Sequence, residues 1–512
     1  MRNMVKLQVL FLLQRIGLPF RHKFCEENKM KKLTTLVLAA GLLVSSFAGS
    51  ASAGEFKPVL QFAEEFTYGD AGAYGPENFN ATSRIRFGFD YVASEDLSAT
   101  ILFQYRKGSW GHNGNDFTAD PEAAMLDAGD HFRMRLAYID WNIPGTDVKV
   151  RMGRHAVVAP SYAFGSAILD GRGDGITVSS AVNDNINVGF TWVRAYSEYA
   201  NSDKLDAWEA NNDYYAPLGD DADLVMLNAE FAYDGFKVAP WVMYAHFDND
   251  AIDPTGWRGN VPTKSNLDID PSSDSFVIGV SAELNMFDPF VFAVDALYSN
   301  TKYHNANAFS TPFLEDSYDG FYIAAKGSYK FDNGTASLGA WYASGTDYYE
   351  EDSPLYRNDK AFMLLDGGFS ASTILFDGNI IGSDGFTNIS NGGADSPFGT
   401  WGIIAEYANF SFLENLSHTA RVLYVKGTNE NETAKVGNLY RDASNLLVGT
   451  LTEDDSVIEI DFDTTYQIYK NLSATLQLGY AIFDQSKLDP FDLTAKEQDD
   501  VFRSALTFVY KF

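Results

Sequence analysis

The stretch Ser83–Val92, SRIRFGFDYV, is followed after a short gap by Leu97–Arg106, LSATILFQYR. In both stretches every second side chain is apolar, as at Ile85 and Phe87, and the residues between them are mostly polar. A period of two residues is typical of a β-strand with one apolar and one polar face. The two stretches therefore predict an antiparallel hairpin that turns at Ala93–Asp96.

The end of the chain repeats this alternation. Ser473–Ile482 has apolar side chains at every second position, and the final strand ends on Phe512. This ending resembles the closing-strand signal of outer-membrane proteins, which the barrel assembly machinery reads at a terminal Phe. On that resemblance Phe508, Tyr510 and Phe512 form the barrel-assembly signal.

The connections between the alternating segments differ in length in a regular way. Tight turns, such as Ala93–Asp96 and Pro144–Gly145, alternate with long connections, such as Gly108–Asp130 and Gly345–Phe398. A membrane barrel has short periplasmic turns and long external loops, whereas a soluble sandwich has no reason to keep that rhythm. We therefore predict a transmembrane antiparallel up-and-down β-barrel of about 18 strands, with 16 as the alternative. A barrel of this size encloses an aqueous lumen.

Composition agrees with a barrel and excludes other classes. The chain has 512 residues, a formal net charge of −31 and 46% hydrophobic residues. After residue 53, no apolar run reaches the roughly 18 residues that a membrane-spanning helix needs. The acidic balance also argues against nucleic acid as a partner, since phosphate binding needs a basic surface.

The N-terminal region has the pattern of a targeting segment. Residues 30–53 combine Lys31 and Lys32, a short apolar run and the sequence Ala51–Ala53, which predicts a cleaved signal peptide. Residues 1–29 do not fit this pattern, and we interpret them as an upstream extension before a start at Met30. The barrel domain is then 54–512, exported to the outer membrane of a Gram-negative bacterium.

Strand parity predicts which side chains face the lumen. If the apolar residues face lipid, a basic stripe on neighbouring strands faces the pore: Arg84, Arg86, Arg106, Arg133, Arg135, Lys149 and Arg151. Ala159–Ile176, rich in small residues, is expected to fold inward as the third external loop and to bring Asp170 and Asp174 opposite this stripe. Further lumen acids are expected at Glu459, Asp461 and Asp463.

These features support a resemblance to a known family. The layout resembles the general trimeric porins, in which the third external loop constricts the pore opposite a wall of arginines. The stretches LAYIDW, VRMGRH and LDGRGDG between Met134 and Ile176 resemble the homotrimeric porins of Desulfovibrio-type bacteria. The resemblance implies a homotrimer with one pore per subunit, although the constriction segment lacks the PEFGG-type sequence of enteric porins.

The favoured function is passive diffusion of small polar solutes, with weak anion preference at the constriction. A substrate-specific channel for sugars or organic acids is the alternative, with Trp141 and Trp341 as candidate stacking residues on the lumen side. A structural or adhesive surface barrel is the alternative of another class. Contact with outer-membrane lipid and lipopolysaccharide is expected in every case.

The sequence lacks the common motifs of enzymes and of metal sites. The histidines after residue 53 show no ligand spacing, and the motifs of serine hydrolases, zinc proteases and phosphate-binding loops are missing from the sequence. We therefore expect no enzyme activity, no metal site and no cofactor. Calcium at the acidic clusters Asp248–Asp250 and Asp268–Asp270 is the weaker alternative, because neither matches the EF-hand loop.

Overall fold

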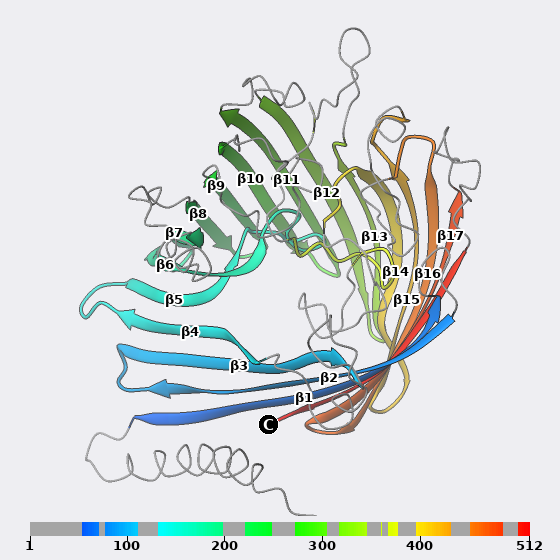
Figure 1. Ribbon diagram of the computed structural model, residues 1–512, viewed down its shortest axis with the longest axis horizontal. Helices are drawn as coiled ribbons and strands as arrows, with labels where there is room; N and C mark the ends of the chain where they lie inside the picture. The colour runs from blue at the N-terminus through cyan, green and yellow to red at the C-terminus, as the bar shows by residue number, and fades with distance from the viewer. Residues whose placement is uncertain are drawn as a thin grey trace, which may run out of the picture. The chain divides into compact units, whose positions relative to one another are not determined.

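The chain folds into strands that follow one another around a closed barrel (Figure 1). The computed structural model describes residues 54–70, 77–110, 132–197, 221–247, 272–304, 317–345, 360, 367–376, 396–431, 451–484 and 500–512. Residues 1–53, with the expected extension and signal peptide, lie outside the described residues. Among the described residues, no helix is long and apolar enough to cross a membrane.

The described chain contains 18 strands, and each pairs with its neighbours in sequence. They are β1 Glu55–Asp70, β2 Glu77–Val92, β3 Leu97–Ser109, β4 Phe132–Asn142, β5 Val148–Val158, β6 Asp170–Asn183, β7 Ile186–Ser197, β8 Asp221–Tyr233, β9 Phe236–Phe247, β10 Ser272–Phe287, β11 Phe290–His304, β12 Ser317–Phe331, β13 Gly334–Ala343, β14 Thr400–Leu413, β15 Leu416–Gly427, β16 Ser456–Tyr469, β17 Leu472–Asp484 and β18 Val501–Lys511. β1 pairs antiparallel with β18, which closes the sheet. The predicted antiparallel barrel and the count of 18 are confirmed, and the alternative of 16 is excluded.

The connections alternate as the sequence predicts. The turns β2–β3, β4–β5, β6–β7 and β8–β9 are tight, and the connections that follow each of them are longer. Gly145 and Gly235 lie in two of these tight turns at φ 77° and 88°, a backbone region that favours glycine. The tight turns thus mark one end of the barrel and the long connections mark the other.

The two faces of the wall differ in chemistry as strand parity predicts. On β16, Ile458 and Ile460 are exposed on the outer side, whereas Glu459, Asp461 and Asp463 on the inner side are buried. Near the tight-turn end, outward aromatic rings pack together, for example Phe290 with Tyr329 at 4.8 Å between ring centroids.

A second set of outward aromatics lies nearer the long-loop end. It includes the stacked pair Phe321–Tyr342 and the pair Trp401–Tyr424, with ring centroids 5.3 and 5.6 Å apart. Two aromatic girdles bordering an apolar band are expected of a barrel wall that crosses a membrane.

Candidate functional site

The third long connection, Ala159–Leu169, leaves the wall and folds into the barrel. β5 pairs with β4 only up to Arg154, and β6 pairs with β7 only from Asp174 onward. In the part of the chain that the structure describes, the end of the β5–β6 hairpin therefore pairs with neither neighbouring strand, which leaves it able to bend inward. Ala159 and Ile168 are fully buried, which confirms the expected inward fold of this loop.

A buried carboxylate on β11 fixes this loop to the inner wall. Asp295 accepts hydrogen bonds from the Ser161 hydroxyl at 2.7 Å and from the backbone N–H groups of Tyr162 and Ala163, each at 2.8 Å. On β10, the Ser281 hydroxyl donates to the Pro160 carbonyl at 2.9 Å. Hydrogen bonds to a charged acceptor are about twice as strong as neutral ones, so Asp295 is the principal anchor of the loop. Sequence analysis did not single out this residue.

A second inward segment, residues 367–376, comes from the long connection between β13 and β14. Glu459 accepts the backbone N–H groups of Ile374 at 2.7 Å and Leu375 at 3.1 Å. Asp461 accepts both the Thr373 hydroxyl at 2.6 Å and its backbone N–H at 3.2 Å. Glu459 and Asp461 thus lie on the lumen side as expected, but they bind a protein segment and do not face open lumen.

The third expected lumen acid belongs to a network of ion pairs on the inner wall. Asp463 accepts from the Arg421 guanidinium at 2.6 Å, and Arg421 also contacts Glu406 at 2.8 Å. Lys326 on β12 joins Glu406 at 3.1 Å. This network links the inner faces of β12, β14, β15 and β16.

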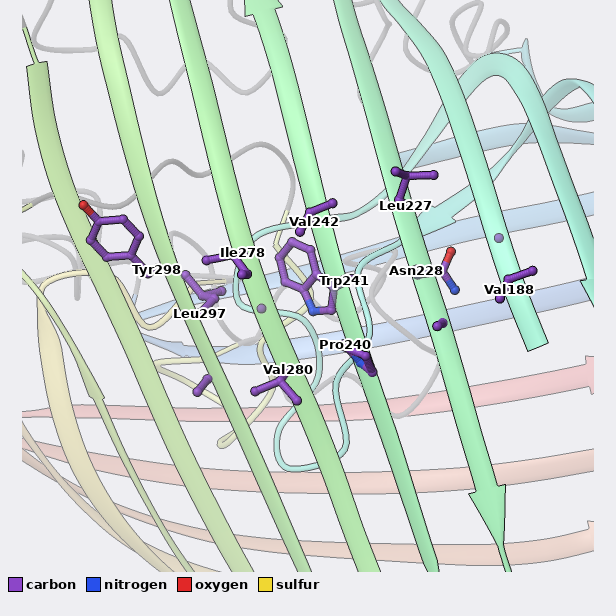
Figure 2. A pocket seen from close by; sticks show the side chains of 14 residues that line it. Val188, Leu227, Asn228, Pro240, Trp241, Val242, Ile278, Val280, Leu297 and Tyr298 are labelled. Atoms are coloured by element: carbon purple, nitrogen blue, oxygen red, sulfur yellow. The ribbon is translucent and has the colours of Figure 1, made fainter. Parts of the chain in front are cut away.

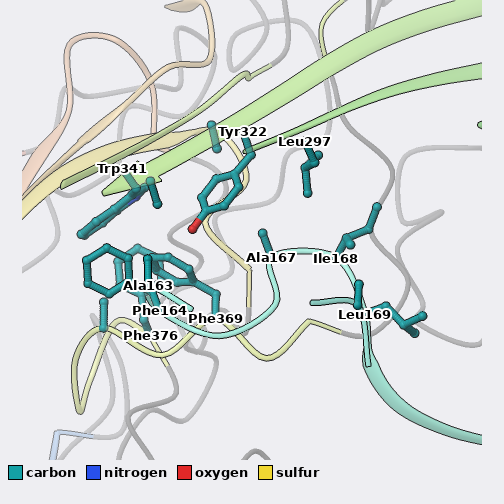
Figure 3. Packing of buried hydrophobic residues seen from close by; sticks show 14 of the residues in the cluster. Ala163, Phe164, Ala167, Ile168, Leu169, Leu297, Tyr322, Trp341, Phe369 and Phe376 are labelled. Carbon is teal, nitrogen blue, oxygen red and sulfur yellow. The ribbon is translucent and has the colours of Figure 1, made fainter. Parts of the chain in front are cut away.

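The two inward segments pack against each other and against the wall (Figure 3). Backbone hydrogen bonds join Gly368 to Ser166 and Ser370 to Phe164, each at 2.8 Å. The Phe164 ring lies 5.6 Å from Phe369 and 5.8 Å from Trp341. One apolar cluster inside the barrel therefore holds both segments on the β11–β16 side.

This cluster changes the interpretation of the two candidate stacking residues. Trp341 does lie on the inner side of β13, but it is 3% exposed beneath the aromatic cluster. Trp141 shares the outer, exposed side of β4 with Ile139, because the inner positions there are Tyr138 and Asp140. Neither ring offers an open stacking surface in the lumen.

Two members of the basic stripe bind one glutamine on β3, and a third contacts a glutamine on β1. Gln104 accepts hydrogen bonds through its Oε1 atom from Arg86 at 3.1 Å and Arg135 at 2.9 Å. A shift in the β3–β4 register between Leu102 and Phe103 turns Arg135 toward this site. On β2, Arg84 is completely buried, with its guanidinium 3.4 Å from Gln61.

The remaining stripe residues have different surroundings. Arg151 and Lys149 both contact Asp140, at 2.7 and 2.9 Å, and the Arg151 guanidinium lies 4.1 Å from the centre of the Tyr138 ring. Arg133 is exposed and lies opposite Gln104 in register, whereas the side chain of Arg106 lies outside the described residues. Asp140 was missed, although it has the same parity as Tyr138 and precedes two basic residues on the next strand.

The two expected constriction acids lie in different places. Asp174 forms an ion pair with Arg154 at 3.2 Å and shares the exposed side of β6 with Ile176, so it does not face the basic stripe. The reason is parity, since the inner positions of β6 here are Gly173, Gly175 and Thr177. Asp170 begins β6 and packs against Gly368 of the second segment.

Charged side chains on the inner wall form ion pairs and hydrogen bonds. Within the described ranges, no group of three or more His, Cys, Asp or Glu side chains could hold a metal ion. The acidic clusters Asp248–Asp250 and Asp268–Asp270 lie outside those ranges. Fixed charges inside an apolar wall bias which ions and polar solutes enter a pore.

Comparison with known proteins adds information on the fold. No protein-family model and no curated protein matches the chain. Among solved structures, Pseudomonas aeruginosa OccK2 (OpdF) in complex with glucuronate is 11% identical, with 90% of this chain and 98% of that chain covered and a TM-score of 0.50. The outer membrane protein OprD from the same organism is also 11% identical, covering 89% and 93% of the two chains with a TM-score of 0.48.

At this identity the likeness concerns the barrel fold. The resemblance to Desulfovibrio-type porins stays a prediction.

Proposed function

We propose that the chain forms a water-filled channel in the outer membrane of a Gram-negative bacterium, through which small hydrophilic solutes diffuse passively. The observation that carries this proposal is the contrast between the two faces of one wall. Exposed aliphatic and aromatic side chains cover the outside, while arginines, acids and amides line the inside. A charged inner face needs water, because a charge at the bilayer midplane costs about 2–4 kcal/mol.

The position of the inward segments suggests where the channel narrows. β3 and β12 are nine strands apart in both directions around the ring of 18. The basic stripe on β2–β5 therefore faces the wall of β11–β16, which holds the two inward segments. Asp295, Glu459 and Asp461 on the β11–β16 wall accept hydrogen bonds from backbone N–H groups. Arg133 on the opposite wall is exposed. A constriction bordered by basic side chains favours anions.

A substrate-specific channel for organic acids is the second candidate. Arg86 and Arg135 converge on one amide oxygen, and paired guanidinium groups suit a carboxylate. The OccK2 structure contains glucuronate, a sugar acid. A homotrimer is part of the main proposal and rests on the porin resemblance. Export rests on the signal-peptide pattern of residues 30–53, and assembly rests on the C-terminal aromatics, which resemble a closing-strand signal.

Single-channel conductance in a planar bilayer tests the proposal, using protein purified from outer membranes. Open steps in groups of three, rising linearly with salt, are expected for a trimeric diffusion channel. Block that saturates with glucuronate, but not with an uncharged sugar of the same size, would favour the substrate-specific alternative. Folded protein that never conducts would contradict both and favour a structural or adhesive barrel.

A further inference from the structure

The outer face of β7–β11 carries a row of basic, acidic and imidazole side chains near the long-loop end. Successive partners in the strand register form this row: Arg194, Asp223, His246, Asp274 and Lys302. Arg194 lies 2.7 Å from Asp223, and His246 lies 2.6 Å from Asp274, with all four side chains 30–39% exposed. We call these five residues the charged row.

The next outward row, two residues nearer the tight turns, mixes aromatic and polar character. It consists of Trp192, Val225, Tyr244, Phe276 and Asn300. The Trp192 indole donates to Asp223 at 3.1 Å, and the Tyr244 hydroxyl donates to Asp274 at 2.6 Å. Rings with their polar ends toward charges and their bodies over an apolar wall mark the boundary between headgroups and hydrocarbon.

Below these rows the same strands carry an apolar groove of about 720 Å³ (Figure 2). Its outward floor has small side chains at Ala229, Pro240 and Ala296. Larger ones border it, among them Leu227, Val242, Ile278 and Tyr298. Pro240, Val280 and Ala296 are register partners, so the hollow crosses three strands.

The spacing between row and groove matches one leaflet of a membrane. His246 and Pro240 lie six residues apart on β9, about 20 Å along a strand at roughly 3.3 Å per residue. With a strand tilt of about 45°, this is a depth of about 14 Å, half of a hydrocarbon core of about 30 Å. An acyl chain whose headgroup lies at the charged row therefore reaches the groove near the membrane centre.

We propose that this face binds one phosphate-bearing glycolipid of the outer leaflet. Its phosphates lie at Arg194 and Lys302, its sugar hydroxyls lie at Asp223 and Asp274, and an acyl chain fills the groove. The row from β7 to β11 spans four strand spacings, about 19 Å, which is wide for a single phosphodiester headgroup. The inference rests on the proposed membrane location but not on conduction.

Native mass spectrometry of the full chain in detergent, titrated with bisphosphorylated lipid A, tests the site. The headgroup variant carries Arg194→Gln, Asp223→Asn and Lys302→Gln, which removes two cations without leaving Asp223 as an uncompensated charge. The groove variant carries Ala229→Leu and Ala296→Leu. The matched controls are Lys426→Gln and Ala420→Leu, on the outer face of β15 away from the row.

We expect the headgroup variant to bind lipid A about 30-fold more weakly than the native chain, and the groove variant about tenfold more weakly. Both controls should bind as the native chain does, and all variants should keep its conductance and heat-modifiable electrophoretic mobility.

Unchanged binding by both test variants would overturn the proposal. Equal binding of dephosphorylated lipid A, or of phosphatidylglycerol, would overturn the assignment of a phosphorylated glycolipid. A native chain that binds lipid A through this face but does not conduct would contradict the proposed channel and leave the lipid site standing.

Discussion

The two sides of the barrel interior use charge in different ways. On β11 and β16, Asp295, Glu459 and Asp461 are buried and accept hydrogen bonds from the two inward segments. On β2–β5, arginines contact Gln104 or Asp140 on the wall itself. Charge on the first side therefore holds two protein segments inside the barrel, whereas charge on the second side contacts groups of the wall.

Removing the carboxylates that hold the second segment should have the largest effect. Glu459→Ala with Asp461→Ala leaves four hydrogen-bond donors of Thr373, Ile374 and Leu375 without their acceptors. We expect a loss of about 4 kcal/mol in the free energy of unfolding, because each buried donor left unsatisfied costs about 1–3 kcal/mol and such losses are not additive. Denaturant titration in lipid vesicles measures the loss, and single-channel conductance should rise. Unchanged conductance would show that this segment does not narrow the pore.

Asp295→Ala tests the anchor of the third loop in the same way. Three donors lose their acceptor, so we expect about 3 kcal/mol lower stability. Asp295→Asn is the matched control, since it keeps one acceptor oxygen and should lose less. Equal stability of the alanine variant and the native chain would mean that packing alone holds the loop.

Phe164→Leu tests the apolar contact between the two segments. Phe164 packs against both Phe369 and Trp341, so its loss should lower stability by about 1 kcal/mol and increase conductance fluctuations. Phe87→Leu is the control, because Phe87 packs with Phe103 on the outer face at 5.6 Å. The Phe87→Leu control should lose a similar amount of stability without larger conductance fluctuations. Equal conductance fluctuations in the two variants would argue against a lumen role for Phe164.

Lys149→Gln should have the smallest effect on stability. Arg151 still pairs with Asp140, so we expect a change below about 0.5 kcal/mol. The anion preference should nevertheless decrease slightly in a reversal-potential measurement. A loss of stability as large as that of Asp295→Ala would mean that the basic stripe also stabilises the fold.

Sequence patterns predicted the strands of the barrel wall better than the segments that fold inside the barrel. Alternation, turn lengths and the final aromatic strand depend on near neighbours, so they indicated the barrel, its closure and the lumen side of Glu459, Asp461 and Asp463. The second inward segment was missed because its anchors lie 84–88 residues away and only the fold brings them together. Asp174 was misplaced because β6 already begins at Asp170, so strand parity, and not a loop conformation, decides where the Asp174 side chain points.

The reversal potential in a salt gradient, compared between the native chain and Arg86→Gln with Arg135→Gln, tests whether the basic stripe sets the ion preference of the channel. We expect an anion-preferring channel whose preference falls clearly in the double variant, with folding retained. Arg154→Gln with Asp174→Asn, an outward pair, should leave the potential unchanged. A cation-preferring native channel, or the same reversal potential in the native chain and the double variant, would show that the basic stripe does not set the ion preference.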